Sequence, residues 1–398
     1  MTGANGLAVT SLSSITVPGN KSVTDEKRRR ALFLYFKDTP QRRGLFADRS
    51  TSCPSRYSFL DPDQFSERGL NVDHNLALAR SIPPGKQAAW DTISRTLHAV
   101  GARGGDFAGV ASTMERANRA DVILSTVDPI GIPLVTFAAL GMIRPPIVYV
   151  SIGLPMRMRQ VTTWARFLYR RIFRRVSRIV AYGFEEAAWL DNWLGFKGNV
   201  RFVPYGVDAD YFCASGEAET NADVLSVGAD INRDFPQLIS CAGRNSHISV
   251  KLVTNREHLS ALGQTPSNLK ILSDVPITEI RAHYAAARVI ALPVKENEYS
   301  GATTTLLQAM AMGKPVVVSN VGAIRSGYGL KDGENCRLAP PGDSAGFERA
   351  IMELLANPEL AARIGANARA HVINNLTWKR YMDDLTGIIM EALQDCAK

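Results

Sequence analysis

The sequence predicts an α/β protein built from two doubly wound, Rossmann-like domains. Short apolar segments of strand type alternate with segments of helix length along most of the chain, which is the pattern of parallel βαβ units. One such series occupies each half, and a Pro/Gly turn near residue 205 separates the two. At 398 residues the chain also exceeds one ordinary core and suits two domains.

The first series is assigned to a domain over residues 28–207. Its expected strands and helices are Ala31–Phe36, Asp121–Ser125 and Ile147–Ser151, with Lys86–Val100 and Phe107–Asn118 between them. Residues 1–27 are rich in Gly, Ser and Thr and lack the apolar stretch of a signal peptide. We therefore expect a disordered leader there.

The second series is assigned to residues 208–376. Its expected strands are Asp223–Gly228, Val250–Thr254, Leu269–Leu272, Val289–Pro293 and Pro315–Ser319. Three segments near the end carry apolar residues at three-to-four spacing and are expected to be helices: Ala345–Ala356, Pro358–Asn374 and Trp378–Asp395.

Composition excludes several classes of protein. No run of 18 apolar residues is present, so no helix is expected to span a bilayer. The five cysteines are scattered and never spaced as a CxxC pair, which argues against a disulfide framework and a structural zinc site and favours a reducing compartment. The net charge of +8 favours anionic partners.

The segment Glu298–Asn320 carries the clearest chemical signal. A strand ends at Pro293, a polar loop containing Gly301 follows, and a helix is expected to begin near Thr303. A helix start offers N–H groups and the positive end of a dipole to an anion such as a diphosphate. An ordinary βαβ connection is equally compatible with this loop alone.

The same segment resembles the donor-binding loop and helix of family 4 glycosyltransferases (glycosyl transferases group 1), which have the GT-B fold. Ser300 and Gln308 stand where that family has the two glutamates of its EX7E motif, so the likeness is divergent and extends to bacterial exopolysaccharide glucuronosyltransferases. In the family the first glutamate contacts the donor sugar and the second the nucleotide ribose. Glu298 is a candidate replacement for the first.

Other segments resemble the same family. They are Val200–Phe212 before the hinge, Asp223–Leu238 at the start of the nucleotide domain, and Asp332–Asp343. The family's diphosphate-binding Val-Gly-Arg is absent, and Arg233 is the nearest cation. The resemblance implies two Rossmann-like domains facing a cleft, with a C-terminal helix (377–398) packing back on the N-terminal domain.

The resemblance also implies a nucleotide-sugar donor, UDP- or GDP-linked, as co-substrate, with no cofactor and no metal. Asp208-Ala-Asp210 matches a metal-binding DxD pattern, but it lies in the hinge passage and is interpreted as a local turn. The expected donor-binding residues are Arg233, Lys295, Glu298, Ser300, Gly301, Ala302, Thr303, Thr304 and Gln308.

Asp128 is the candidate catalytic base, because an acceptor hydroxyl must lose a proton and this carboxylate follows an expected strand. It falls at the glutamate of the family's His-x-His-Glu-Pro loop, whose histidines are missing here. An Asx-turn before Pro129 is the alternative interpretation. Asp38 is the second choice for the base.

The segment Trp164–Val180 predicts a basic amphipathic helix. Leu168, Ile172, Val176 and Ile179 are expected to face the domain core. The opposite face is predicted to contact an anionic membrane surface. Its residues are Trp164, Arg166, Phe167, Arg170, Arg171, Arg174, Arg175 and Arg178. A solvated face and a nucleic-acid surface are the alternatives, and no nucleic-acid-binding module is recognisable.

Together these features predict a hexosyltransferase that moves a hexose or hexuronic acid from a nucleotide sugar to a lipid-linked or glycolipid acceptor. We expect it in the cytoplasm of a bacterium, at the inner face of the cell membrane, in cell-surface polysaccharide synthesis; its oligomeric state is left open. The alternatives are a sugar-nucleotide epimerase of the same fold and a catalytically degenerate sugar-nucleotide-binding scaffold.

Overall fold

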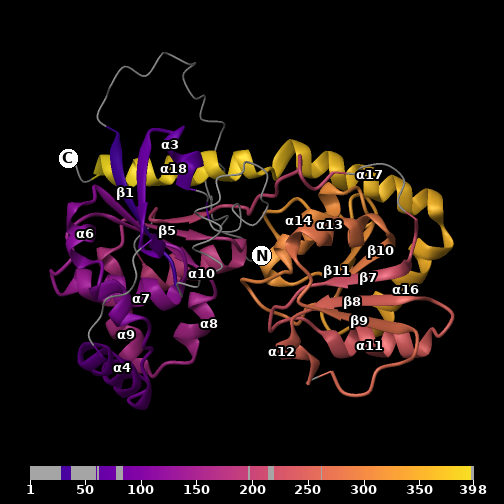
Figure 1. Ribbon diagram of the computed structural model, residues 1–398, viewed down its shortest axis with the longest axis horizontal. Helices are drawn as coiled ribbons and strands as arrows, with labels where there is room; N and C mark the ends of the chain where they lie inside the picture. The colour runs from indigo at the N-terminus through magenta and orange to yellow at the C-terminus, as the bar shows by residue number, and fades with distance from the viewer. Residues whose placement is uncertain are drawn as a thin grey trace, which may run out of the picture.

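A computed structural model describes residues 28–36, 60, 62–77, 84–195, 198–213, 219–260 and 262–395. The expected leader and Asp38 lie outside these residues. Two parallel sheets, each of six strands, form the centres of the two halves. They lie side by side along the long axis of the molecule (Figure 1). The predicted pair of Rossmann-like domains is confirmed.

The first sheet has the strand order β2-β1-β3-β4-β5-β6. Its strands are β1 (Arg29–Leu34), β2 (Leu70–His74), β3 (Val122–Ser125), β4 (Ile147–Ser151), β5 (Arg178–Ala181) and β6 (Val200–Phe202). The helices around it are α3 (Pro62–Ser66), α4 (Pro84–Ala99), α5 (Phe107–Ala111), α6 (Met114–Arg119), α7 (Asp128–Ala139), α8 (Leu154–Arg159), α9 (Thr163–Ile172) and α10 (Phe184–Leu194). The single helix expected over 107–118 is thus two short helices.

The second sheet has the order β12-β11-β10-β7-β8-β9. Its strands are β7 (Ala222–Val227), β8 (Val250–Thr254), β9 (Leu269–Ser273), β10 (Ala287–Leu292), β11 (Val316–Ser319) and β12 (Arg337–Ala339). Its helices are α11 (Phe235–Arg244), α12 (Arg256–Leu259), α13 (Ile277–Ala285), α14 (Thr303–Ala311), α15 (Gly322–Arg325), α16 (Ser344–Ala356) and α17 (Pro358–Asn375). The edge strands β2 and β12 were not predicted.

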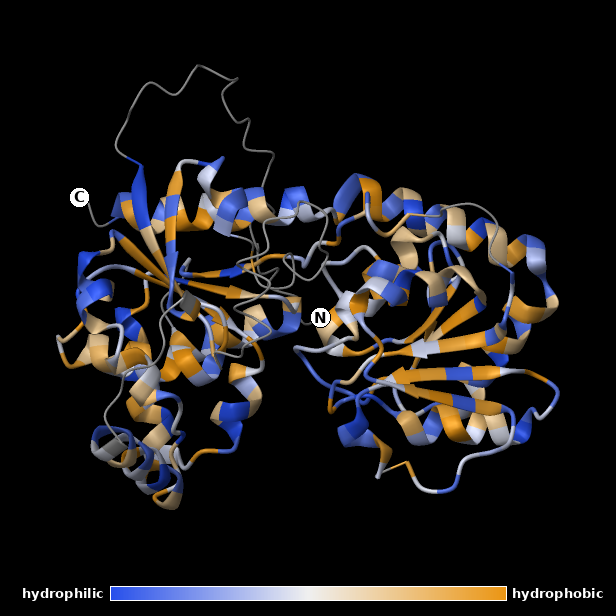
Figure 2. Cartoon of the chain, in the orientation of Figure 1, coloured by the Kyte–Doolittle hydropathy of each residue, from blue (hydrophilic) through white to orange (hydrophobic). Residues whose placement is uncertain are grey.

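The central strands are buried on both faces because helices cover both sides of each sheet. Every residue of β3, β4, β8 and β11 is buried, and the strands form apolar bands inside each half (Figure 2). This burial explains why their sequences are mostly apolar, although β8 also contains Lys251. It also explains why these strands were the easiest elements to predict.

The last helix, α18 (Trp378–Asp395), leaves the C-terminal half and packs on the N-terminal sheet, as predicted. It runs along one side of the N-terminal half, in continuation of α17 (Figure 1). Tyr381, Leu385 and Ile389 lie in one buried cluster with residues of β1, β3 and β4. At its end, Glu391 and Asp395 form ion pairs with Arg178 of β5.

The prediction of one helix over Trp164–Val180 is wrong in its second half. The α-helix α9 ends at Ile172, a 3-10 turn (Phe173–Arg175) follows, and β5 occupies the rest. All four residues of β5 are buried between β4 and β6. Sheet pairing therefore outweighs the three-to-four spacing of the arginines in this segment.

No helix in the described part of the chain is long and apolar enough to cross a membrane.

Candidate active site

Both halves place their loops where parallel sheets bind ligands. In each sheet the strand order reverses beside the first strand, between β1 and β3 and between β7 and β10. The loops that follow these strand pairs diverge and leave a crevice at the carboxyl edge. The stretch 228–234 after β7 and the stretch 293–302 after β10 therefore meet in the C-terminal half. Asp128 follows β3 in the N-terminal half.

Asn297 shapes the loop before α14. Its side-chain oxygen accepts hydrogen bonds from the backbone N–H groups of Tyr299 (3.1 Å) and Ser300 (2.6 Å). Its side-chain nitrogen donates to the carbonyls of Lys295 and Ser300, each at 2.8 Å. Because Asn side chains close such turns, the polar stretch after β10 signals this geometry from the sequence. Asn297 was nevertheless not singled out as a site residue.

The beginning of α14 presents uncapped backbone N–H groups. Its N-cap is Ala302, in the left-handed region (φ 55°), with no side-chain cap. The Thr305 hydroxyl donates back to the Ala302 carbonyl at 2.9 Å. No Ser or Thr side chain therefore caps this helix within the described residues. Gly301 is buried against Ile324, where a Cβ would clash. Thr303 and Thr304 form the first turn of the helix.

Arg233 is a buried cation whose hydrogen-bonding groups are mostly unused. Its side chain is 3% exposed and lies over Gly228, where a Cβ would approach within 3.2 Å of Cζ. One terminal nitrogen donates to Ser226 Oγ at 3.0 Å. Nε and Nη1 are buried without a hydrogen-bond partner, and no carboxylate of the described chain pairs with it. Burial lowers the pKa of Arg233 to about 10. Such a group calls for an anion.

Tyr284 connects Arg233 with α14. It is buried close enough to Arg233 for each to influence the pKa of the other. Its hydroxyl donates to the Thr305 carbonyl and to Gln308 Oε1, both at 3.3 Å. Gln308 is itself buried. The predicted Arg233 and Gln308 are therefore brought together, through a tyrosine that was not predicted.

Ion pairs join the two halves beside the donor loop. Arg159 of α8 pairs with Glu298 at 2.8 Å, and Arg325 of α15 pairs with Glu185 of α10 at 2.9 Å and with Glu296 at 2.8 Å. A cavity of about 380 Å³ lies here. It is lined by Gly153, Pro155, Met156, Arg159, Glu185, Asn232, Glu296, Asn297, Glu298, Tyr299 and Arg325. Lys295, at the edge of this region, is exposed.

Asp128 is the first residue of α7, and its side chain is fully buried. Tyr149 donates to Oδ1 at 2.8 Å, and Arg157 Nε contacts Oδ2 at 3.1 Å. Burial raises the pKa of Asp128, and the charge of Arg157 and the hydrogen bond from Tyr149 oppose the shift. Arg157, which contacts this carboxylate, also lines a neighbouring cavity.

Glu186, in the first turn of α10, is a buried carboxyl that sequence reasoning missed. Oε1 accepts hydrogen bonds from Ser151 Oγ (2.6 Å) and the Gly153 N–H (2.9 Å), and Oε2 is buried without a partner. Burial raises the pKa of Glu186 to about 8, and Asp128 contributes to the rise. In the sequence it is one of two adjacent glutamates at a helix start, which gave no sign of burial.

The hinge aspartates lie in a local turn. Asp208 Oδ1 accepts hydrogen bonds from the N–H groups of Asp210 (3.2 Å) and Tyr211 (3.0 Å). Within the described residues, no group of three or more His, Cys, Asp or Glu side chains is arranged to hold a metal. Independence from metal stays a prediction.

The basic helix presents a different face from the one expected. Leu168 was expected in the core but is 45% exposed, beside Trp164 (50%) and Phe167 (69%). Val176 and Ile179 are buried as expected, and Ala165, Tyr169 and Phe173 are buried as well. We call Trp164, Phe167, Leu168, Arg170, Arg171, Arg174 and Arg175 the α9 face; all of them are exposed.

Two predicted arginines do not belong to the α9 face. Arg178 is 9% exposed and ion-paired with Glu391 and Asp395, so its assignment to a membrane-binding surface is wrong. Arg166 is half-buried and donates to the carbonyls of Met158 and Arg159.

Comparison with known proteins identifies the class of protein to which this architecture is related. Residues 232–357 match the family model of glycosyl transferases group 1. The chain is 25% identical over 368 residues to an MMP alpha-(1->4)-mannosyltransferase from Mycolicibacterium hassiacum. The aligned region covers 87% of this chain and 86% of the relative.

A second relative and a solved structure extend the comparison. The chain is 27% identical over 213 residues to a GDP-mannose-dependent alpha-(1-6)-phosphatidylinositol monomannoside mannosyltransferase from Mycolicibacterium smegmatis, covering 46% of this chain and 54% of the relative. The structure of Anabaena Alr3699/HepE in complex with UDP-glucose superposes with a TM-score of 0.65 at 17% identity, over 92% of this chain and 99% of that chain.

Proposed function

We propose that this chain, a glycosyltransferase of the GT-B fold related to glycosyl transferases group 1, moves a hexose or hexuronic acid from a UDP- or GDP-sugar to a membrane-associated acceptor. The acceptor is lipid-linked or a glycolipid, and the product is a cell-surface glycan. The observation that carries the donor half of this proposal is Arg233, a buried guanidinium with two unpaired nitrogens. It lies near Tyr284, which contacts the first turn of the uncapped helix α14.

The unpaired guanidinium of Arg233 favours a diphosphate, the leaving group of the donor, as its ligand. Transfer requires the diphosphate to leave with its negative charge stabilised, and preorganised donors in a site sheltered from water do this most effectively. Arg233, the N–H groups of the first turn of α14 and the exposed Lys295 supply such donors without a metal. Gln308 replaces a carboxylate near the nucleotide and retains hydrogen-bonding capacity.

Asp128 is the proposed base for the acceptor hydroxyl. A carboxylate with a raised pKa is better suited to accept a proton near neutral pH than an exposed one. It meets the acceptor once Arg157 moves away from Oδ2, because that arginine both contacts the carboxylate and lines the neighbouring cavity.

Nucleotide binding tests the donor site. We expect calorimetric titration of the full chain to detect UDP or GDP, and Arg233→Gln to weaken binding at least about 30-fold because a charge-assisted contact to phosphate is lost. Arg256→Gln is the matched control, since Arg256 is an exposed arginine of the same half. Equal affinities of the two variants would refute the donor site. Release of nucleoside diphosphate from a nucleotide sugar on addition of membrane extract then tests transfer.

The α9 face supports the membrane-associated acceptor. It combines four exposed arginines with three exposed apolar side chains. Aromatic rings and arginine stems suit the headgroup region of a bilayer, and each basic residue adds about 1 kcal/mol near an anionic surface. The relative from Mycolicibacterium smegmatis is named for a phosphatidylinositol-linked acceptor, which agrees with this choice.

Vesicle sedimentation tests the membrane contact. Arg171→Glu/Arg175→Glu is expected to lower affinity for phosphatidylglycerol vesicles at least about 10-fold, and added salt is expected to lower the affinity of the wild type. Arg349→Glu/Arg363→Glu makes the same charge change on exposed helix positions of the C-terminal half. If both double variants bind equally, the α9 face is not the contact.

A further inference from the structure

A second cavity, of about 440 Å³, opens at the carboxyl edge of β1 and β3. It lies within the N-terminal half and is separate from the donor loop. Its lining residues are Phe36, Asp91, Ser94, His98, Arg103, Gly104, Gly105, Asp106, Pro129, Ile132 and Arg157. A volume of this size accommodates a small polar molecule or a headgroup.

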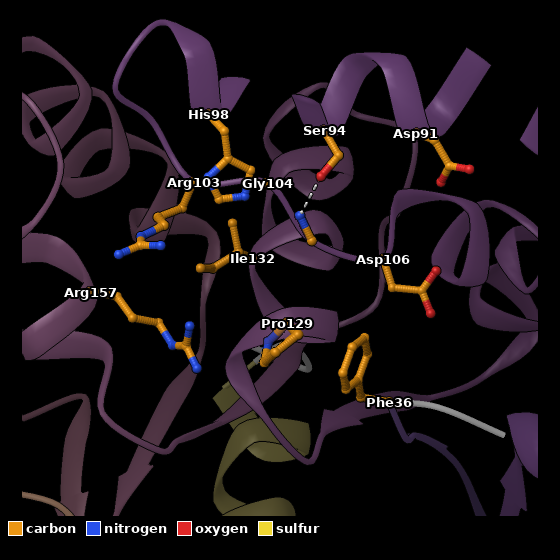
Figure 3. Close-up of a pocket in the computed structure, with 11 residues that line it drawn as sticks. Phe36, Asp91, Ser94, His98, Arg103, Gly104, Asp106, Pro129, Ile132 and Arg157 are labelled. Carbon is orange, nitrogen blue, oxygen red and sulfur yellow. Dashed lines mark hydrogen bonds between the residues drawn. The ribbon is translucent and has the colours of Figure 1, made fainter. Parts of the chain in front are cut away.

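The cavity has two walls of different chemistry. His98, Arg103 and Arg157 lie on one side of it, and Asp91, Asp106 and Phe36 lie on the other (Figure 3). The Arg103 side chain donates to the neutral Gln160 and pairs with no carboxylate of the described chain. Arg157 uses Nε for Asp128, which leaves its terminal nitrogens for other partners. One wall therefore offers hydrogen-bond donors and positive charge.

The loop that carries Arg103 is fixed before any ligand binds. The Arg103 N–H donates to the Tyr169 hydroxyl at 2.9 Å, which in turn donates to the Arg103 carbonyl at 2.6 Å. The Gly105 N–H donates to Ser94 Oγ at 3.2 Å. Gly104 lies so close to Ser94 that a Cβ would clash. Fixed donors lose little entropy when a ligand binds.

We propose that this cavity binds a hydroxylated acceptor through a phosphoryl group, held by Arg103, Arg157 and His98 with its hydroxyls toward the carboxylates of Asp91 and Asp106. This inference rests on the proposed function, because it takes the N-terminal half as the acceptor side. A carboxylate is satisfied by one bidentate arginine, whereas the oxygens of a phosphoryl group can meet three donors arranged around it. Sugar hydroxyls need acceptors, and the carboxylates of the opposite wall have lone pairs beyond those that accept from the Gly109 N–H and from Gln87.

The position of Arg157 couples acceptor binding to the base. The same side chain holds Oδ2 of Asp128 and lines the cavity. A phosphoryl group that draws Arg157 toward itself weakens the contact with Asp128. The acceptor thereby uncovers the carboxylate that removes its proton.

Calorimetric titration with glycerol 3-phosphate, and with glycerol as the uncharged comparison, tests the site at saturating UDP or GDP. The wild type is expected to bind glycerol 3-phosphate at least about 10-fold more tightly than glycerol, and Arg103→Gln is expected to remove most of that preference. Arg95→Gln is the control, because Arg95 is exposed on α4 and does not line the cavity. No preference for the phosphate, or equal losses in Arg103→Gln and Arg95→Gln, would overturn the proposal.

The source of the phosphoryl group is tested by competition. Phosphatidylglycerol vesicles that displace bound glycerol 3-phosphate from the wild type indicate a lipid headgroup, and vesicles that leave it bound indicate a soluble acceptor; each result requires the Arg103-dependent site. Nucleotide affinity separates this proposal from the proposed function. It is expected to stay unchanged in Arg103→Gln and to fall in Arg233→Gln, so loss of the phosphate preference with intact nucleotide binding concerns the acceptor cavity alone.

Discussion

The two halves of the molecule treat a buried charge in opposite ways. In the N-terminal half, Asp128 is fully buried and has partners on both oxygens, Tyr149 and Arg157. In the C-terminal half, Arg233 is almost as deeply buried, yet among the described residues its side chain has a single hydrogen-bond partner, the Ser226 hydroxyl. Each group follows a strand at the switch point of its sheet.

The difference indicates how each half meets its substrate. A buried charge that no carboxylate contacts is costly, and Asp230 acts on Arg233 only from a distance, so Arg233 is completed when an anion arrives. Both oxygens of Asp128 already have partners, so the carboxylate has to release one of them, Arg157, before it accepts a proton. The donor half is therefore preorganised for binding, and the acceptor half is held in a paired state that binding opens.

The largest expected effect comes from Asp128→Asn. The amide cannot accept the acceptor's proton, so we expect turnover to fall by about 100-fold to 10,000-fold. Nucleotide affinity, measured by calorimetry, is expected to change little, because the donor half is built separately. A variant with normal turnover would show that Asp128 only closes the start of α7.

Arg233→Met is expected to have the opposite effects on binding and stability. It removes an unpaired buried cation, so the free energy of unfolding of the ligand-free protein is expected to rise by about 1–4 kcal/mol while nucleotide binding is lost. Urea unfolding with and without UDP or GDP measures both. A destabilised ligand-free variant would mean that the Ser226 contact already satisfies the cation.

Glu186 provides a pH test at a buried position of the N-terminal half, where it contacts Ser151 and Gly153. Its folded-state pKa of about 8 exceeds the ordinary value of 4.5. The stability linked to its proton is therefore fully present below about pH 4.5 and is lost as pH rises toward 8, by at most about 1.4 kcal/mol per pH unit. Between pH 5.5 and 7.5, the free energy of unfolding of Glu186→Gln is expected to fall less than that of the wild type. If the free energy of unfolding depends on pH equally in the wild type and the variant, the pKa of Glu186 is not raised.

The smallest effect is expected from the ion pair between Arg159 and Glu298. Both side chains are partly exposed, so their coupling in a double-mutant cycle of Arg159→Gln and Glu298→Gln is expected to stay below about 1 kcal/mol in unfolding experiments. The Michaelis constant for the donor separates two roles of Glu298. A rise in Glu298→Gln alone indicates contact with the donor sugar, whereas equal changes in both variants indicate only the pair between the halves.

The sequence was informative where burial is continuous. Strands such as β4 and β8 are buried on both faces, so their position follows from composition alone. The segment of β5 contains arginine spacing that also fits a helix, and only its pairing with β4 and β6 decides between the two. The same tertiary contacts remove Arg178 from the surface and expose Leu168.

The loops of the site could be predicted from the sequence, whereas the side chains that contact the site residues could not. The position of the Glu298–Asn320 segment and of Arg233 followed from local chemistry and resemblance. Tyr284 and Arg157 are far along the chain from the groups they contact, and Glu186 has no neighbour in sequence that signals its burial. Contacts of this kind arise only when parallel strands bring separate loops to one edge.

The crossing of α18 has a consequence for biosynthesis. This helix covers the face of the N-terminal sheet that includes Phe33 and Val148. The ion pair of Arg68 likewise forms with Asp383, which lies 315 residues later in the chain. While a ribosome makes the chain from its first residue, that apolar face stays uncovered until residues 378–395 emerge. The half that is translated first is thus the half that finishes folding last, and until then its bare sheet is the surface for which a chaperone would compete.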